Sequence, residues 1–294
     1  PGDKVLIRGL RLSGGTTPGT GGAIRVINAA DVQIDRVEMY ANSADQGGGA
    51  VSVVGGVVTL DRVDLHDNGT AGEGAAVRNA TDLTIHASSI RDNLDLQPAG
   101  QREAVAGVGG GITRILNSTL SGNNGHGVDV DDGTLQIENS SLIANDRRGI
   151  EFQSLTGRTL FLRNTVISGN ADGACIAPGL GAPTISTDGY NLAQDNGCQI
   201  HLGGSNFINA DAGIGALVVD PARFSAYHLP QPGSPLIDAG HPLVGGLGCI
   251  ETDQIGSARP IDGDGNGQAR CDIGAIEAPF VALPDLMFSD GFED

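Results

Sequence analysis

Residues 32–42, 58–68 and 83–93 read VQIDRVEMYAN, VTLDRVDLHDN and LTIHASSIRDN. Three phrases of the same form follow at 113–123, 135–145 and 160–170, which read TRILNSTLSGN, LQIENSSLIAN and LFLRNTVISGN. Every phrase ends in asparagine, and the six residues are Asn42, Asn68, Asn93, Asn123, Asn145 and Asn170. They are separated by 26, 25, 30, 22 and 25 residues. A repeat of this length is typical of a solenoid.

Apolar residues recur at fixed distances before each asparagine. Eight residues before it stand Ile34, Leu60, Ile85, Ile115, Ile137 and Leu162. Three residues before it stand Met39, Leu65, Ile90, Leu120, Leu142 and Ile167. Ten residues before it, five of the six residues are Val or Leu. Steps of two predict strands with one buried face, whereas the odd step from position −8 to position −5 requires a corner between two short strands.

A third apolar segment follows a glycine cluster in most repeats. It reads GGAIRV at 21–26, GGAVSV at 48–53, GAAV at 74–77, GVDV at 127–130 and GIEF at 149–152. The sequence therefore predicts an all-β protein, a right-handed parallel β-helix with three-strand coils of about 25 residues stacked at about 4.8 Å. Asparagine tolerates left-handed backbone angles, and its amide can bond the asparagine of the next coil. We therefore expect the six residues to form a ladder.

The composition agrees with a thin, elongated core. Of 294 residues 47 are Gly, aromatic residues make up 3%, and Trp is absent. A broad globular core would use more aromatic filling. The net charge of −18 argues against nucleic acid and anionic membranes as partners. No apolar stretch is long enough to span a membrane, and we expect the chain to be a processed or trimmed secreted protein.

Residues 4–15 resemble an earlier coil, and residues 94–108 interrupt the spacing as an extended corner loop. An end coil exposes unpaired backbone groups, so solenoids carry caps. Here hardly any sequence precedes the first coil. We therefore expect its edge to be covered by a segment outside this sequence or by another molecule stacked end to end. The alternative is that residues 94–108 or the C-terminal tail fold back over it.

The chain resembles known bacterial surface proteins in two places. Gly21–Ile24, Gly48–Val51 and Asn117–Asn123 resemble the repeats of polymorphic outer-membrane proteins. The C-terminal third carries Tyr190-Asn191-Leu192, Asp220-Pro221, 233–240 (GSPLIDAG), Arg259-Pro260 and 271–277 (CDIGAIE), and it resembles the choice-of-anchor Q region of secreted β-helix proteins. The last residues, LMFSDGFED, resemble a tail on exported proteins of some gammaproteobacteria. The resemblance implies a bacterial protein that is secreted or held at the cell surface.

From these patterns we expect regular coils over 1–174, an irregular closing region continuous with the helix over 175–280, and a tail over 281–294. The four cysteines allow three pairings, of which the local one closes the shortest loops. It joins Cys175 with Cys198 and Cys249 with Cys271. Paired cysteines are typical of an oxidising, extracellular compartment.

Two motifs could carry chemistry. Gly125-His126-Gly127 with Asp129, Asp131 and Asp132 is similar to polygalacturonases only in the tripeptide and an acidic pair, and it occupies the place of an ordinary glycine corner. We expect a structural corner with an exposed His126, and we assign no catalytic residue. Asp262-Gly263-Asp264-Gly265-Asn266-Gly267 is half of an EF-hand-type calcium loop, since Ile273 stands at the twelfth place. The calcium ligands would be Asp262, Asp264, Asn266, the carbonyl of Gln268 and Asp272 or Glu277, and the alternative is an acidic glycine-rich turn.

Two functions fit the predicted fold, which cannot itself decide between them. The first is a non-enzymatic binding, adhesion or structural module for a surface ligand such as a glycan or a host surface. The second is a polysaccharide lyase or glycoside hydrolase on the same fold. We favour the first because the sequence shows no acid/base constellation. Three or more carboxylates or arginines converging in one groove would restore the second.

Overall fold

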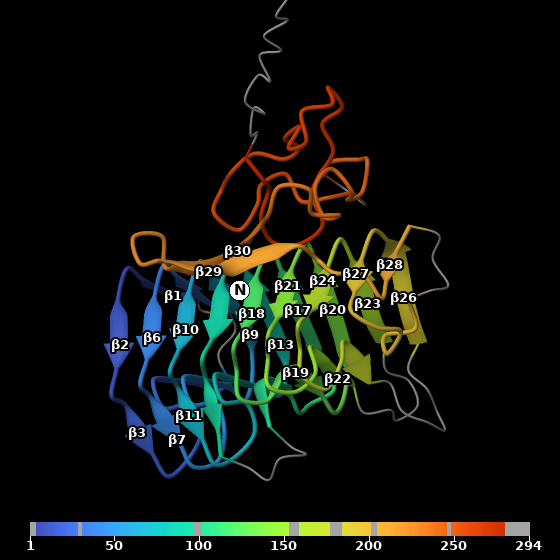
Figure 1. Ribbon diagram of the computed structural model, residues 1–294. Coiled ribbons are helices and arrows are strands. Elements are labelled where there is room, and N and C mark those ends of the chain that lie inside the picture. Colours follow the sequence, from blue (N-terminus) through green and yellow to red (C-terminus); the bar gives the residue numbers. More distant parts are fainter. Residues whose placement is uncertain are drawn as a thin grey trace, which may run out of the picture.

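A computed structural model describes residues 4–28, 31–96, 102–152, 159–176, 184–200, 205–245 and 248–279. Within these ranges the chain is all β and forms a parallel β-solenoid of stacked coils, which run from left to right in Figure 1. The predicted fold class is confirmed. Helices of the length and apolarity needed to cross a membrane are absent from this described part of the chain.

The first four coils pass through the sheets in the order A, B, C, D, and the later coils pass from sheet B to sheet D without a strand in sheet C. Sheet A consists of β1 (Lys4–Arg8), β5 (Asp31–Asp35), β9 (Val57–Asp61), β13 (Asp82–His86), β17 (Ile112–Leu116), β20 (Thr134–Glu138), β23 (Thr159–Arg163) and β26 (Thr184–Gly189). Sheet B consists of β2 (Arg11–Ser13), β6 (Glu38–Tyr40), β10 (Asp64–His66), β14 (Ser89–Arg91), β18 (Thr119–Ser121), β21 (Ser141–Ile143), β24 (Val166–Ser168), β27 (Leu192–Ala193) and β28 (Phe207–Ile208).

The glycine-led segments form sheet D, and a short sheet C appears in addition to the three predicted strands. Sheet D consists of β4 (Ile24–Val26), β8 (Val51–Val53), β12 (Val77–Asn79), β16 (Glu103–Gly107), β19 (His126–Val130), β22 (Ile150–Phe152) and β25 (Cys175–Ile176). Sheet C consists of the two-residue strands β3 (Thr16–Thr17), β7 (Ser43–Ala44), β11 (Gly69–Thr70) and β15 (Leu94–Asp95). All four sheets pair their strands in parallel.

The predicted apolar positions stack in internal rows. Ile34 pairs with Leu60, Leu60 with Ile85, and the row continues through Ile115, Ile137 and Leu162. All six side chains are fully buried. The predicted corner after sheet A is a residue with positive φ in every coil, namely Gly9, Arg36, Arg62, Ala87, Asn117, Asn139, Asn164 and Tyr190.

The asparagine ladder is present, but its backbone explanation needs correction. Each ladder asparagine from Asn42 to Asn145 donates from Nδ2 to Oδ1 of the asparagine in the next coil at 2.9–3.1 Å. The left-handed residue at this corner is the one before the asparagine, for example Ala41 and Asp67. The asparagine itself is therefore required for its amide, which must point inward, and not for its backbone freedom.

The C-terminal third leaves the helix in two steps. Strands β26, β27 and β28 still extend sheets A and B, so coil pairing continues past residue 174. The chain then forms the antiparallel hairpin of β29 (Ile214–Asp220) and β30 (Ser225–Pro230), which crosses several coils in Figure 1. The described residues 231–245 and 248–279 contain isolated β-bridges but no further strand, and they lie beyond the hairpin on the same side. We call 231–279 the C-terminal lobe. The tail at 281–294 lies outside the described residues.

Two disulfides join Cys175 with Cys198 and Cys249 with Cys271, as predicted.

At the N-terminal end of the solenoid, β1 pairs with β5, and Val5, Leu6 and Leu10 remain exposed. Of the extended corner loop expected at 94–108, residues 94–95 form β15 and residues 103–107 form β16, and residues 97–101 lie outside the described ranges. End-to-end self-association therefore stays a prediction.

Candidate functional site

The β29–β30 hairpin and the C-terminal lobe are fastened to the outer face of sheet B by polar contacts. The Ser89 hydroxyl accepts a hydrogen bond from the Ala226 amide, and Ser121 Oγ lies 2.9 Å from His228 Nε2. Thr119 Oγ1 donates to Gln254 Oε1 at 2.6 Å. These contacts are buried, so the lobe is fixed on the solenoid and forms one wall of the spaces beside it.

A groove of about 340 Å³ lies between the lobe and the corner that joins sheets A and B. The solenoid contributes Arg36, Asp61, Arg62, His86 and Ala87, and the other wall is 222–223 and 253–256. We call this space the arginine groove. Its volume is within the range of ligand pockets in proteins.

The arginines of the groove are held by a buried carboxylate. Asp35 is 3% exposed and accepts from Arg62 at 2.8 Å and from Arg36 at 3.2 Å. Arg8 Nε lies 2.6 Å from the same carboxylate. All three arginine side chains are close to half exposed, so one buried negative charge positions three solvent-facing guanidinium groups. Arg223, which pairs with Asp220, approaches from the hairpin turn.

Asp61 and His86 form a pair inside the groove, one coil apart. His86 Nδ1 lies 2.8 Å from Asp61 Oδ1, and Arg62 lies 2.6 Å from the other oxygen of Asp61. Partial burial alone would raise the pKa of Asp61, but the hydrogen bond with His86 and the charge of Arg62 hold it below its ordinary value. Asp61 is therefore ionised at neutral pH and fixes the orientation of the His86 ring.

The second acidic residue of the groove, Asp253, is committed to the backbone. One oxygen accepts from the amides of Ile255 and Ser257, and the other accepts from the amide of Glu277. Among the residues that line the groove, both carboxylates thus have partners within the protein: Asp61 is paired with side chains and Asp253 with backbone amides. The paired catalytic carboxylates that glycoside hydrolysis uses are not assembled there.

A second space of about 380 Å³ continues along the same corner. Its solenoid wall is Leu116, Glu138 and Arg163. Asp61, His86, Leu116, Glu138 and Arg163 are register partners in successive strands, so they form one outward row along sheet A. The two spaces therefore lie one after the other along the solenoid axis, beside the same row.

The predicted calcium loop forms a compact acidic turn. Asp262 and Asp264 lie together, and both accept a hydrogen bond from the Asn266 amide. The third carboxylate beside them is Asp238, with ligand oxygens of the three within 4.8 Å of one another. Asn266 Oδ1 accepts from the Gln268 amide. Asp238 precedes the motif by many residues, and no spacing rule would have found it.

The carboxylates proposed to complete that loop are used elsewhere. Asp272 accepts from the amides of Asp238 and Ala278, and Glu277 pairs with the fully buried Arg259 at 2.9 Å. Burial raises the pKa of Asp272 to about 7, and the charge of Glu277 adds to this effect. These residues hold the lobe together, and the carboxylate that lies beside the acidic turn is Asp238, which accepts from the amides of Gly263, Asp264 and Arg270.

The expectation of an exposed His126 is wrong. His126 is 1% exposed, its Nδ1 accepts from the Arg148 amide, and Nε2 lies 3.5 Å from Glu151. Burial, and secondly the charges of Arg147 and Arg148, lower its pKa to about 4. The glycines on both sides allow close approach of the neighbouring coils, and the ring is buried against Arg148 and Glu151 of the next coil. A structural role for this corner agrees with the geometry.

Sequence reasoning missed the residues of the arginine groove. Arg36 and Arg62 follow the same Ile-Asp or Leu-Asp step in consecutive repeats, and this was the available signal. Arg223, which lines the same groove, belongs to the hairpin. The convergence of the three arginines is therefore evident only in the folded structure.

Comparisons with known proteins bear on the fold. Residues 22–212 match the family model described as "Right handed beta helix region". No curated protein and no solved structure matches the chain.

Proposed function

The chain belongs to the right-handed β-helix family, and from this premise we propose that it is a non-enzymatic module that binds an anionic glycan along the arginine groove. The single observation that carries the proposal is the convergence of Arg36, Arg62 and Arg223 in one groove. In a chain with a net charge of −18, such a cluster selects for carboxylate or sulfate groups.

The shape of the site supports a polymer as the ligand. The arginine groove and the second space follow one row of residues along the solenoid axis. An extended polysaccharide lying beside that row would meet equivalent positions in successive coils, which are about 4.8 Å apart. Two disulfides favour an oxidising compartment and so support a secreted or cell-surface location.

The test compares acidic with neutral polysaccharides. Binding of polygalacturonate, alginate and dextran sulfate is measured beside neutral dextran by biolayer interferometry. We expect at least one acidic polymer to bind and neutral dextran not to bind. Binding should weaken strongly at 1 M salt, where the screening length falls to about 3 Å.

Arginine variants connect that binding to the groove. Arg36→Ser and Arg223→Ala should each weaken binding about tenfold, since charged hydrogen bonds are worth about 1.5–3 kcal/mol. Arg78→Ala is the matched control, because Arg78 pairs with Glu73 on sheet D, away from the groove. Equal weakening by all three variants, or equal binding of neutral dextran, would contradict the proposal.

The Asp61–His86 pair favours a second candidate function, a polysaccharide lyase or hydrolase. Three or more arginines in one groove would favour an enzyme, and Arg36, Arg62 and Arg223 converge in this way. His86, which Asp61 holds in one orientation, can also transfer a proton. The same acidic polymers are incubated with the protein, and new chain ends are measured. Chain cleavage that is lost in His86→Asn would replace the binding proposal by the enzymatic one.

A further inference from the structure

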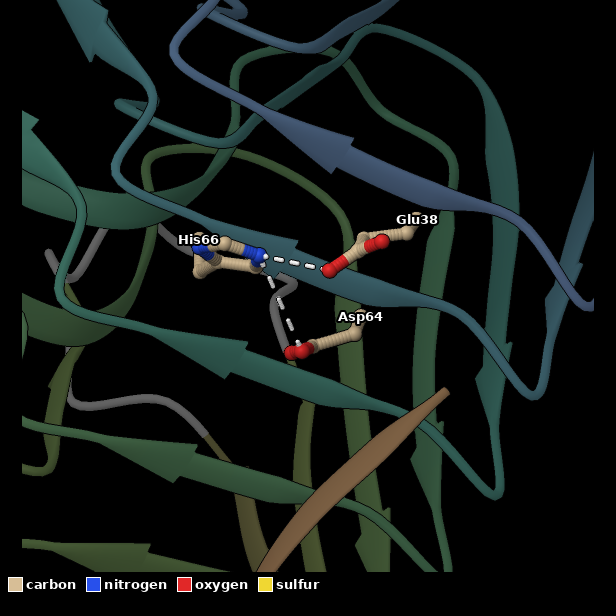
Figure 2. A group of neighbouring side chains, drawn as sticks. All are labelled: Glu38, Asp64 and His66. Atoms are coloured by element: carbon tan, nitrogen blue, oxygen red, sulfur yellow. Dashed lines mark hydrogen bonds and ion pairs between the residues drawn. The ribbon is translucent and has the colours of Figure 1, made fainter. Parts of the chain in front are cut away.

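A second cluster of charged side chains lies on the outer face of sheet B, on the first coils. Figure 2 shows Glu38 of β6 with Asp64 and His66 of β10, and the His66 ring is directed toward both carboxylates. Strands β6 and β10 are paired with Glu38 opposite Asp64 and Tyr40 opposite His66. Backbone pairing therefore fixes the relative positions of the three side chains.

The three side chains present ligand atoms at the spacing of a metal site. His66 Nε2 lies 3.2 Å from Glu38 Oε1 and 4.0 Å from Asp64 Oδ2, and one ligand atom from each residue lies within 4.8 Å of the others. Ligands at the usual bond lengths to tetrahedral zinc are about 3.4 Å apart. Small side-chain rotations suffice to bring the three atoms around one ion.

The orientation of His66 is set from its other nitrogen. Nδ1 lies 2.7 Å from Asp67 Oδ2, and Tyr40 stacks on the ring with an interplanar angle of 4°. In the tautomer that carries its proton on Nδ1, His66 donates to Asp67 and turns the Nε2 lone pair toward Glu38 and Asp64, whose oxygens are also acceptors. A histidine that binds a metal usually donates its other ring N–H to a carboxylate, which fixes the orientation of the ring. In this tautomer three lone pairs converge on one point, an arrangement that a cation between them would stabilise.

The charge of the surrounding network agrees with a divalent ion. Glu38 pairs with Arg11, Asp64 with Arg91, and Arg91 also with Asp92. With Asp67 included, four carboxylates face two arginines, so the network carries two negative charges in excess when His66 is neutral. The side chains of Glu38, Asp64 and His66 are at most 15% exposed, which limits screening by solvent.

We propose that Glu38, Asp64 and His66 form a binding site for a divalent transition-metal ion of the zinc type. One histidine with two carboxylates suits zinc better than calcium, which prefers oxygen ligands alone. Three protein ligands leave a fourth coordination position open to solvent or to a ligand. The site is separate from the arginine groove, and its occupation does not depend on the proposed glycan binding.

The experiment measures binding of zinc alone to chelator-treated protein by isothermal titration calorimetry. We expect one zinc ion per chain at this site, a loss of affinity of at least a hundredfold in His66→Asn, and a weakening of about 10–100-fold in Asp67→Asn. Cobalt should give the visible absorption of low-symmetry coordination in the parent protein and lose it in His66→Asn.

Two variants serve as controls. His86→Asn removes another histidine that touches a single carboxylate, Asp61, and it should bind zinc like the parent. Asp262→Asn alters the acidic turn of the lobe and should also leave the zinc affinity unchanged. An unchanged affinity in His66→Asn, zinc binding that is lost in Asp262→Asn, or no zinc binding by the parent would each overturn the proposal. Circular dichroism of every variant verifies that the fold is retained.

Discussion

The side-chain amide of Asn93 donates a hydrogen bond of 3.0 Å to Oδ1 of Asn123, which occupies the same place in the next coil. The same amide group also donates to the carbonyl of Leu65 in the preceding coil, so one side chain joins three successive coils. Asn93 is 1% exposed, and bulk water cannot replace these bonds. The ladder is therefore the polar counterpart of the apolar rows.

Replacing Asn93 by Ala should destabilise the protein by several kcal/mol. The substitution leaves the Asn68 amide and the Leu65 carbonyl without the side-chain partner they have now, and each buried group left unsatisfied costs about 1–3 kcal/mol. Urea unfolding followed by circular dichroism measures the change. Gln33→Ala, on the exposed face of sheet A, is the control and should be nearly neutral. Equal midpoints for the two variants would show that the ladder contributes nothing.

Leu120 should not accept a charged side chain. Its side chain is fully buried between Ile90 and Leu142 in the inner row of sheet B. Leu120→Asp buries a carboxylate without a partner and should prevent folding. Thr59→Asp, on the outer face of sheet A, should fold normally.

A milder substitution at Leu120 gives a measurable free energy. Leu120→Ala should cost about 2–5 kcal/mol, the usual range for a large core side chain reduced to alanine. A cost below 1 kcal/mol, or normal folding of Leu120→Asp, would mean that the row is not the core of the molecule.

Glu103 should make the protein less stable as the pH rises. It is 4% exposed, and burial raises its pKa to about 9, with a further contribution from the charge of Asp129. The unfolded chain releases this proton near pH 4.5, whereas the folded chain retains it to about pH 9. Folded protein then binds more protons than unfolded protein, so the free energy of unfolding falls with increasing pH across that window.

Glu103→Gln removes this dependence, because the amide keeps a carbonyl oxygen for the Gly74 amide and carries no charge. At pH 8 the variant should unfold at a higher urea concentration than the parent, and the difference should vanish below pH 4.5. Glu251→Gln, an exposed carboxylate, is the control. A variant that is less stable than the parent at pH 8 would contradict the assignment.

Calcium binding to the acidic turn stays a prediction, with Asp238 now placed beside Asp262 and Asp264. Added calcium should raise the melting temperature, since a ligand at a hundred times its dissociation constant stabilises by about 2.7 kcal/mol. The shift should disappear in Asp264→Asn and persist in Asp211→Asn, an exposed carboxylate outside the cluster. A melting temperature that responds to neither calcium nor chelator would remove the case for this site.

The sequence by itself determined the architecture of the coils. The rows through Ile34 and Met39, the corner between them and the asparagine ladder follow from offsets within a single repeat. This was possible because each coil contacts mainly its neighbours, so that the same local requirements recur and become visible as a period. The local disulfide pairing followed from the short loops that it closes.

The tertiary structure alone decided where the functional surfaces lie. The arginine groove needs the hairpin residue Arg223 beside Arg36, and the acidic turn needs Asp238 beside Asp262. Strand register was also required to place Glu38 opposite Asp64 and within 3.2 Å of His66. Outward-facing residues are not constrained by core packing, and apart from the Asp-Arg step at Arg36 and Arg62 those of the proposed sites do not recur from repeat to repeat. Their chemistry depends on which coils and which part of the C-terminal lobe meet in space, and only the folded chain fixes those contacts.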